Sequence, residues 1–162
     1  MEDLAFARAL HVLAVVVWIG GVAMVTTVLL PAIRRLPLSD DPVALFERVE
    51  RRFAFQARIL TLVAGLSGFY MVYRLNAWSR YLSPASWWLH AMTLVWLIFT
   101  IILFVLEPLV LHKRLAKRAE RDPQGTLLLI QRAHWGLLAI SLIAVAGAVA
   151  GSHGWTLGGV GP

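Results

Sequence analysis

Long uncharged runs alternate with short charged segments along this chain. Three of the runs approach or exceed the roughly 20 residues that a helix needs to cross a bilayer; they cover 9–33, 81–106 and 133–151. Each run contains small or polar residues at helical spacing, and clusters of basic residues lie between the first and second spans and between the third and fourth. The pattern predicts helices that cross a membrane.

A further run, 59–73, is shorter than the others. It has only 15 uncharged positions, so we expect its helix to begin near Phe53 and to carry Arg58 into the membrane. The chain is then a single all-α membrane domain, 1–162, built as a four-transmembrane-helix bundle and ending in a flexible, glycine-rich tail at 152–162. The spans are expected near 8–33, 53–74, 86–112 and 126–151.

Composition agrees with the pattern and narrows the chemistry. The chain is 59% hydrophobic, with a mean hydropathy of +0.73, and soluble domains rarely reach such values. It contains no cysteine, which excludes disulfides, thiolate metal sites, covalent haem attachment and a cysteine nucleophile. A bound metal or haem must therefore be held by histidine, methionine or carboxylates.

The basic residues are distributed unevenly between the two ends of the predicted helices. Of the 15 Lys and Arg residues, twelve lie in or beside the segments that join spans one to two and three to four. The other three are Arg8, Arg74 and Arg80. By the positive-inside rule, both termini face the periplasm and the chain is a multi-pass protein of the bacterial inner (plasma) membrane. The rule also accounts for the net charge of +6, so no nucleic acid partner is expected.

Two helix starts can be located from Asp-Pro pairs. Asp41 with Pro42, and Asp122 with Pro123, each place a capping carboxylate before a proline that fits the first helical position. Helices two and four are therefore expected to extend beyond the membrane at this end.

Because the helices alternate in direction, the ionisable side chains fall into two layers. His11, His90 and His153 lie near the outer face, whereas the inner layer contains Arg58, Glu107, Arg132 and His134. Arg58 and Glu107 match in depth and have opposite charges, which predicts a buried ion pair. The alternative for Arg58 is a site for a haem propionate or a quinone.

The outer histidines suggest a cofactor between the helices. His11 and His90 could bind a b-type haem from opposite sides, giving a six-coordinate, low-spin iron, with Thr93 holding a ligand ring. Trp18 would line the pocket, and Arg58, Arg132 or His134 would contact the cofactor. Copper is the alternative, held by His11, His90, Met92 and His153.

Several stretches carry a family resemblance. "LHVLAVVVWIGGVAMVTTVLLPAI" resembles the opening helix of CopD-like membrane proteins, which are linked to copper uptake or resistance. The likeness continues through "FERVERRFAFQARILTLVAGLSG", "WWLHAMTLVW" and "LEPLVLHKRL". The layout also resembles HemJ, a haem-dependent protoporphyrinogen oxidase whose first-helix histidine, matched here by His11, ligates haem b. HemJ carries a lysine two residues after its third-helix histidine, where this chain has Met92, which argues against protoporphyrinogen oxidation.

Three functions follow from these observations. The leading hypothesis is a haem b protein of the lipid bilayer, a membrane oxidoreductase that passes electrons between quinone and a redox partner. The second is a CopD-type copper protein, and the third is a non-catalytic membrane anchor or assembly subunit. The sequence has no nucleophile–base pair, glycine-rich phosphate loop or carboxylate dyad, so it gives no support to a hydrolase or a kinase.

Overall fold

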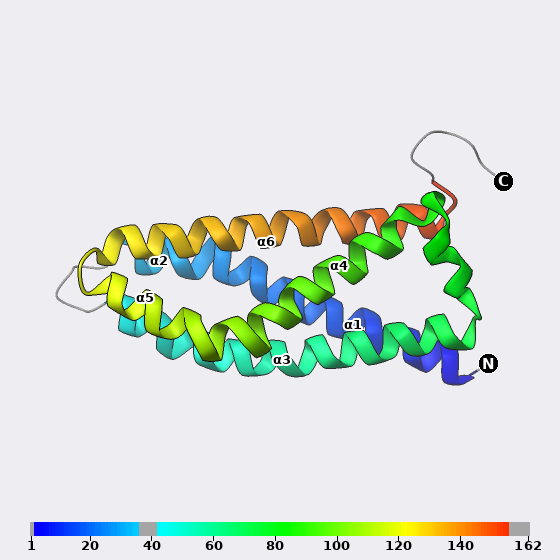
Figure 1. The fold of residues 1–162 in the computed structure, drawn as a ribbon, viewed down its shortest axis with the longest axis horizontal. Coiled ribbons are helices and arrows are strands. Elements are labelled where there is room, and N and C mark those ends of the chain that lie inside the picture. Colours follow the sequence, from blue (N-terminus) through cyan, green and yellow to red (C-terminus); the bar gives the residue numbers. More distant parts are fainter. Residues whose placement is uncertain (1, 36–41, 156–162) are drawn as a thin grey trace.

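Four helical rods lie side by side in the structure, a computed structural model that describes residues 2–35 and 42–155 (Figure 1). All regular structure in these residues is helical. The first rod joins α1 (Glu2–Met24), η1 (Val25–Leu29) and α2 (Leu30–Ile33), and the second is α3 (Pro42–Arg74). The third joins α4 (Trp87–Ile101), η5 (Ile102–Leu111) and α5 (His112–Ala119), and the fourth is α6 (Pro123–Ser152). Two 3₁₀ turns, η3 (Ala77–Leu82) and η4 (Pro84–Ser86), connect α3 to α4.

Each rod is long and apolar enough to cross a membrane. The candidate spans are Glu2–Ile33, Val43–Arg74, Pro84–Leu111 and Pro123–Ser152. Large apolar side chains such as Phe6, Leu66 and Tyr73 are exposed on the outside of the bundle, where lipid tails would cover them. The predicted all-α architecture with four spans is confirmed, and the chain is a multi-pass membrane protein.

The helix starts can be compared with the predicted caps. The Asp122 carboxylate accepts a 2.8 Å hydrogen bond from the Gly125 amide, with Pro123 in the first turn, so this cap is confirmed. Asp41 lies outside the described residues, as does the predicted tail from residue 156 onward. The second helix is continuous from Pro42 and therefore includes the segment before Phe53 that was expected to precede the span.

The rods do not pair equally. α1 packs mainly along α3, and α4 packs mainly along α6. Figure 1 shows α4 leaving the side of α6 and descending toward α3, which η5 then meets. We call the end where α1 begins and α6 finishes the terminal end. The opposite end, with α2, α5 and the starts of α3 and α6, is the basic end.

The core runs through the middle of all four rods. At its centre, the rings of Trp18 and Phe99 meet edge to face with centroids 4.8 Å apart. Glycines admit large rings elsewhere, since a Cβ on Gly65 would lie 2.5 Å from the Trp96 indole nitrogen. That nitrogen donates a 2.9 Å hydrogen bond to the Thr61 carbonyl of α3. The rods are thus fixed by ring packing as well as by small-residue contacts.

Both π-helical segments are associated with a proline. η1 ends two residues before Pro31, and η5 contains Pro108. Proline has no amide hydrogen, and a π-helix bonds each amide to the carbonyl five residues earlier. Pro108 therefore leaves the Leu103 carbonyl without its helical donor.

Candidate functional site

His11 lies on α1 where that helix packs against α3. Its Nδ1 is 2.8 Å from the Ala64 carbonyl oxygen and 3.2 Å from the Ser67 hydroxyl oxygen. The Ser67 hydroxyl donates to the Val63 carbonyl at 2.6 Å, so its oxygen is available as an acceptor toward the ring. Both contacts therefore place the hydrogen of the imidazole on Nδ1.

The other ring nitrogen of His11 is left with a lone pair. Nε2 has no hydrogen bond among the described residues, and it is not one of the fully buried atoms that lack a partner. A histidine that binds a metal has this arrangement, with one N–H donated to a carbonyl and the second nitrogen free. The imidazole is oriented by α3 and can act as a base or as a ligand through Nε2.

Two neighbours define the surroundings of this ring. Gly68 of α3 lies against it, since a Cβ at that position would be 3.2 Å from His11 Cε1. Arg8 precedes His11 by three residues and so shares its face of α1. Its side chain is exposed and has no partner in the described part of the chain. Arg8 was not among the predicted site residues, because its charge was used only to predict topology, although its i, i+3 spacing from His11 is visible in the sequence.

A polar cluster at the terminal end fixes α1 against α3. The Tyr70 hydroxyl donates to Asp3 at 2.9 Å, and Arg74 forms an ion pair with Asp3 at 2.7 Å. His11 lies about 12 Å further along α1 at 1.5 Å per residue. The ring is therefore positioned between this cluster and the core.

His90 occupies a different setting, on the exposed side of α4. Its Nε2 is 2.9 Å from the Tyr81 carbonyl oxygen and its Nδ1 is 3.2 Å from the Ser86 carbonyl oxygen. The Tyr81 ring lies edge-on to it. Both nitrogens thus face carbonyl groups, and the one N–H of a neutral ring can donate to either of them.

Among the described residues His11 and His90 share no contact: His11 faces Ala64 and Ser67 of α3, and His90 faces the Tyr81 and Ser86 carbonyls. Thr93 does not hold His90 either. Its hydroxyl donates to the Leu89 carbonyl and pairs with the Tyr81 hydroxyl at 2.9 Å, so its hydrogen-bonding capacity is used by α4 and η3. No hydrogen bond joins Thr93 to His11 or His90 among the described residues, and the expectation that Thr93 holds a ligand ring is wrong.

The other predicted site residues are scattered. Trp18 is buried in the core with its Nε1 unpartnered, and Met92 of α4 packs against the core. His153 is exposed and contacts the Val149 carbonyl, while Arg132 is exposed at the basic end. His134 has its Nδ1 2.9 Å from the Ile130 carbonyl and an edge contact with Phe46. Within residues 2–35 and 42–155, no three His, Asp or Glu side chains gather as a metal site.

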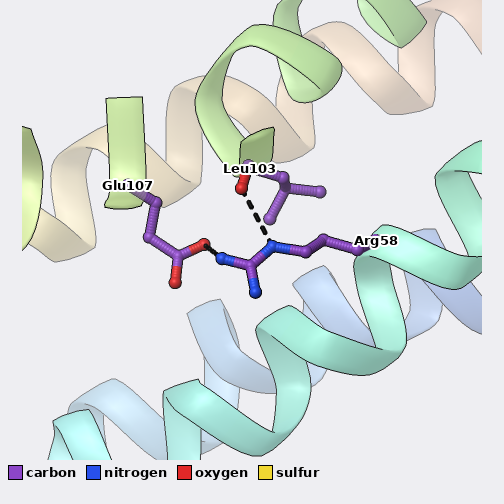
Figure 2. Close-up of polar contacts among 3 residues, drawn as sticks. All are labelled: Arg58, Leu103 and Glu107. Atoms are coloured by element: carbon purple, nitrogen blue, oxygen red, sulfur yellow. Dashed lines mark hydrogen bonds and ion pairs between the residues drawn. The ribbon is translucent and has the colours of Figure 1, made fainter. Parts of the chain in front are cut away.

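The predicted pair of Arg58 and Glu107 is present (Figure 2). Arg58 Nη2 lies 2.9 Å from Glu107 Oε2, and the two side chains are 31% and 22% exposed. Arg58 Nε also donates a 2.9 Å hydrogen bond to the Leu103 carbonyl. One guanidinium thus joins α3 to two points on η5.

The carbonyl that Arg58 contacts is the one that Pro108 leaves without a donor. The helix interruption and the ion pair therefore form one unit, in which Arg58 supplies the hydrogen bond that proline cannot. The ion pair was predicted from the opposite charges of Arg58 and Glu107. The hydrogen bond from Arg58 to the Leu103 carbonyl was not predicted, although Pro108 directly follows Glu107. A small cavity of about 40 Å³ adjoins Glu107, between the starts of α3 and α6, with room for one or two waters.

Comparison with known proteins adds no relative: no family model, no curated protein and no solved structure matches this chain.

Proposed function

We propose that this chain is a b-type haem protein in which His11 is the axial ligand. The observation that supports this most is the orientation of its ring, with Nδ1–H donated to the Ala64 carbonyl and Nε2 free. A carbonyl partner fixes the tautomer and increases the basicity of the ligating nitrogen. Iron held in this way supplies one-electron chemistry, which suits exchange with a quinone or a redox partner protein.

The geometry favours one imidazole ligand rather than two. Both nitrogens of His90 face backbone carbonyls, so neither nitrogen has an open approach for an iron, and moving the ring would break its hydrogen bond to one of these carbonyls. Arg58 is engaged by Glu107 and lies about 13 Å along α3 from Ser67 at 1.5 Å per residue. Arg8, on the same face as His11 and without a partner, is better placed to hold a carboxylate of the porphyrin.

The proposed setting is the bacterial inner membrane with both termini outside. The twelve-to-three division of basic residues supports this orientation. His11 and Arg8 then lie in the outer half of the membrane, on the periplasmic side.

Haem content after expression with added haem tests the proposal. The wild-type protein, His11→Ala, His90→Ala and His134→Ala are purified in detergent and their visible spectra are compared. We expect His11→Ala alone to lose the Soret band, and Arg8→Gln to retain haem more weakly. His90→Ala and His134→Ala serve as matched controls that each remove one membrane histidine.

Two results would contradict the haem function. A wild-type protein that stays colourless after haem supplementation would do so, as would equal haem content in all three histidine variants. Stoichiometric copper bound through His11 and His90, without haem, would support the CopD-type alternative instead.

A further inference from the structure

A shallow hollow of about 540 Å³ lies where α5 turns into α6 at the basic end. It is lined by four cations and one carboxylate: Arg114, Lys117, Arg118, Arg121 and Asp122. Arg114, Lys117 and Arg118 follow one another at i, i+3 and i+4 and so share one face of α5, and Arg121 lies in the turn that follows it. All four side chains are exposed.

The positive charges of this hollow are not neutralised by the protein. None of the four cations has an ion pair in the described part of the chain. The one carboxylate, Asp122, is occupied as the N-cap of α6, where it accepts from the Gly125 amide at 2.8 Å. The hollow is thus built to receive negative charge from outside the chain.

The opposite face of α5 fixes the hollow in place. Leu115 and Ala119 pack against the buried cluster at the basic end, which includes Leu127 of α6. α5 continues the third span, which ends at Leu111, and α6 begins the fourth span at Pro123. The hollow therefore lies just beyond the apolar spans, at the level of the lipid headgroups.

We propose that this hollow binds the phosphate headgroup of an anionic phospholipid. Arginine guanidinium groups form paired hydrogen bonds with phosphate oxygens, and basic clusters directly beside a span attract anionic lipids. A general positive-inside bias needs only charges near the membrane, whereas this site has three arginines and a lysine on α5 and the turn that follows it, around a concavity. The site does not depend on the proposed haem function.

A matched pair of triple variants tests the site. Arg114→Gln, Arg118→Gln and Arg121→Gln remove three charges from the hollow. Arg48→Gln, Arg51→Gln and Arg52→Gln remove three exposed charges from α3 at the same end, outside the hollow. Each protein is placed in nanodiscs of phosphatidylcholine with or without phosphatidylglycerol, and bound phosphatidylglycerol is counted by native mass spectrometry.

We expect the hollow variant to bind phosphatidylglycerol on the order of 100-fold more weakly, because three basic contacts are lost and each contributes about fivefold. The α3 variant should remain close to the wild type. Equal losses in the two triples would overturn the proposal, since net charge alone would then explain binding. Displacement of the lipid by millimolar inorganic phosphate would overturn it in favour of a soluble phosphate ligand.

Single charge reversals test the site if the triple variant of the hollow does not fold. Lys117→Glu reverses one exposed charge in the hollow, and Arg51→Glu reverses one on α3. Selective loss of phosphatidylglycerol from Lys117→Glu supports the site, and equal behaviour of the two variants contradicts it.

Discussion

The polar side chains within the membrane spans differ between the two ends of this bundle in whether all their hydrogen-bonding groups have partners. Near the basic end, Arg58 satisfies both the Glu107 carboxylate and the Leu103 carbonyl, so each strong group has a partner within the protein. Near the terminal end, His11 donates through Nδ1 to α3 but its Nε2 has no partner in the described residues. Both arrangements join α3 to another rod.

The difference separates a structural role from a chemical one. A buried charge with all its partners stabilises one packing of the helices and offers nothing to a ligand. An imidazole oriented through one nitrogen retains a directed lone pair, which is what a metal requires. We therefore expect changes at Arg58 and Glu107 to affect stability, and changes at His11 to affect cofactor binding.

The largest stability effect is expected from Glu107→Ala. The change leaves the Arg58 guanidinium without its anion inside the membrane, at a cost of about 3–5 kcal/mol. The double variant Arg58→Leu with Glu107→Ala should lose less than the single variant, because no charge is stranded. Unfolding measured in detergent by loss of helical signal checks both values, and additive losses would show that the pair contributes nothing.

A smaller effect is expected at the α1–α3 contact that positions His11. A Cβ on Gly21 would lie 2.2 Å from the Phe53 ring, whereas one on Gly20 would meet nothing within 4 Å. Gly21→Ala should therefore destabilise the protein by about 1–3 kcal/mol through overpacking. Gly20→Ala, its neighbour and control, should be neutral or stabilising by up to about 1 kcal/mol, because alanine favours helix. Similar melting temperatures for the two variants would contradict the packing of α1 on α3.

The smallest effect concerns the link between Pro108 and Arg58. In a Glu107→Gln background, Arg58→Leu leaves the Leu103 carbonyl without a donor, at about 1–3 kcal/mol. Pro108→Ala restores an amide hydrogen, so the same Arg58→Leu change should cost about 1 kcal/mol less in its presence. A double-mutant cycle measures this coupling, and a coupling of zero would mean that Arg58 does not replace the missing helical bond.

Much of this arrangement was predictable from the sequence. The uncharged runs indicated four spans, and opposite charges at equal depth indicated the Arg58–Glu107 pair. The pairing of His11 with His90 rested on their matching depth and on the small or hydroxyl residues of their helix faces, and neither reveals which helices are neighbours. Here Ala64 and Ser67 of α3 lie beside His11, while His90 follows the 3₁₀ turns that lead into α4.

The π-helical segments were a second feature, besides the neighbours of each helix, that hydrophobic periodicity could not predict. The spans containing Pro31 and Pro108 were treated as regular, but both rods contain a π-helical segment near the proline. A π-helical turn holds about one residue more than an α-helical turn, and such a local change hardly alters the hydrophobic pattern. The proline was therefore the only sign of the π-helical segment in the sequence.

The spin state of the bound haem tests the central claim most directly. Electron paramagnetic resonance of the oxidised, haem-loaded protein should show a high-spin iron, because the proposed site offers the iron one imidazole, that of His11. The same high-spin signal should persist in His90→Ala and disappear with the haem in His11→Ala. A low-spin signal in the wild type that becomes high-spin in His90→Ala would contradict this account, since it would require His90 to leave its carbonyl partners and bind the iron opposite His11.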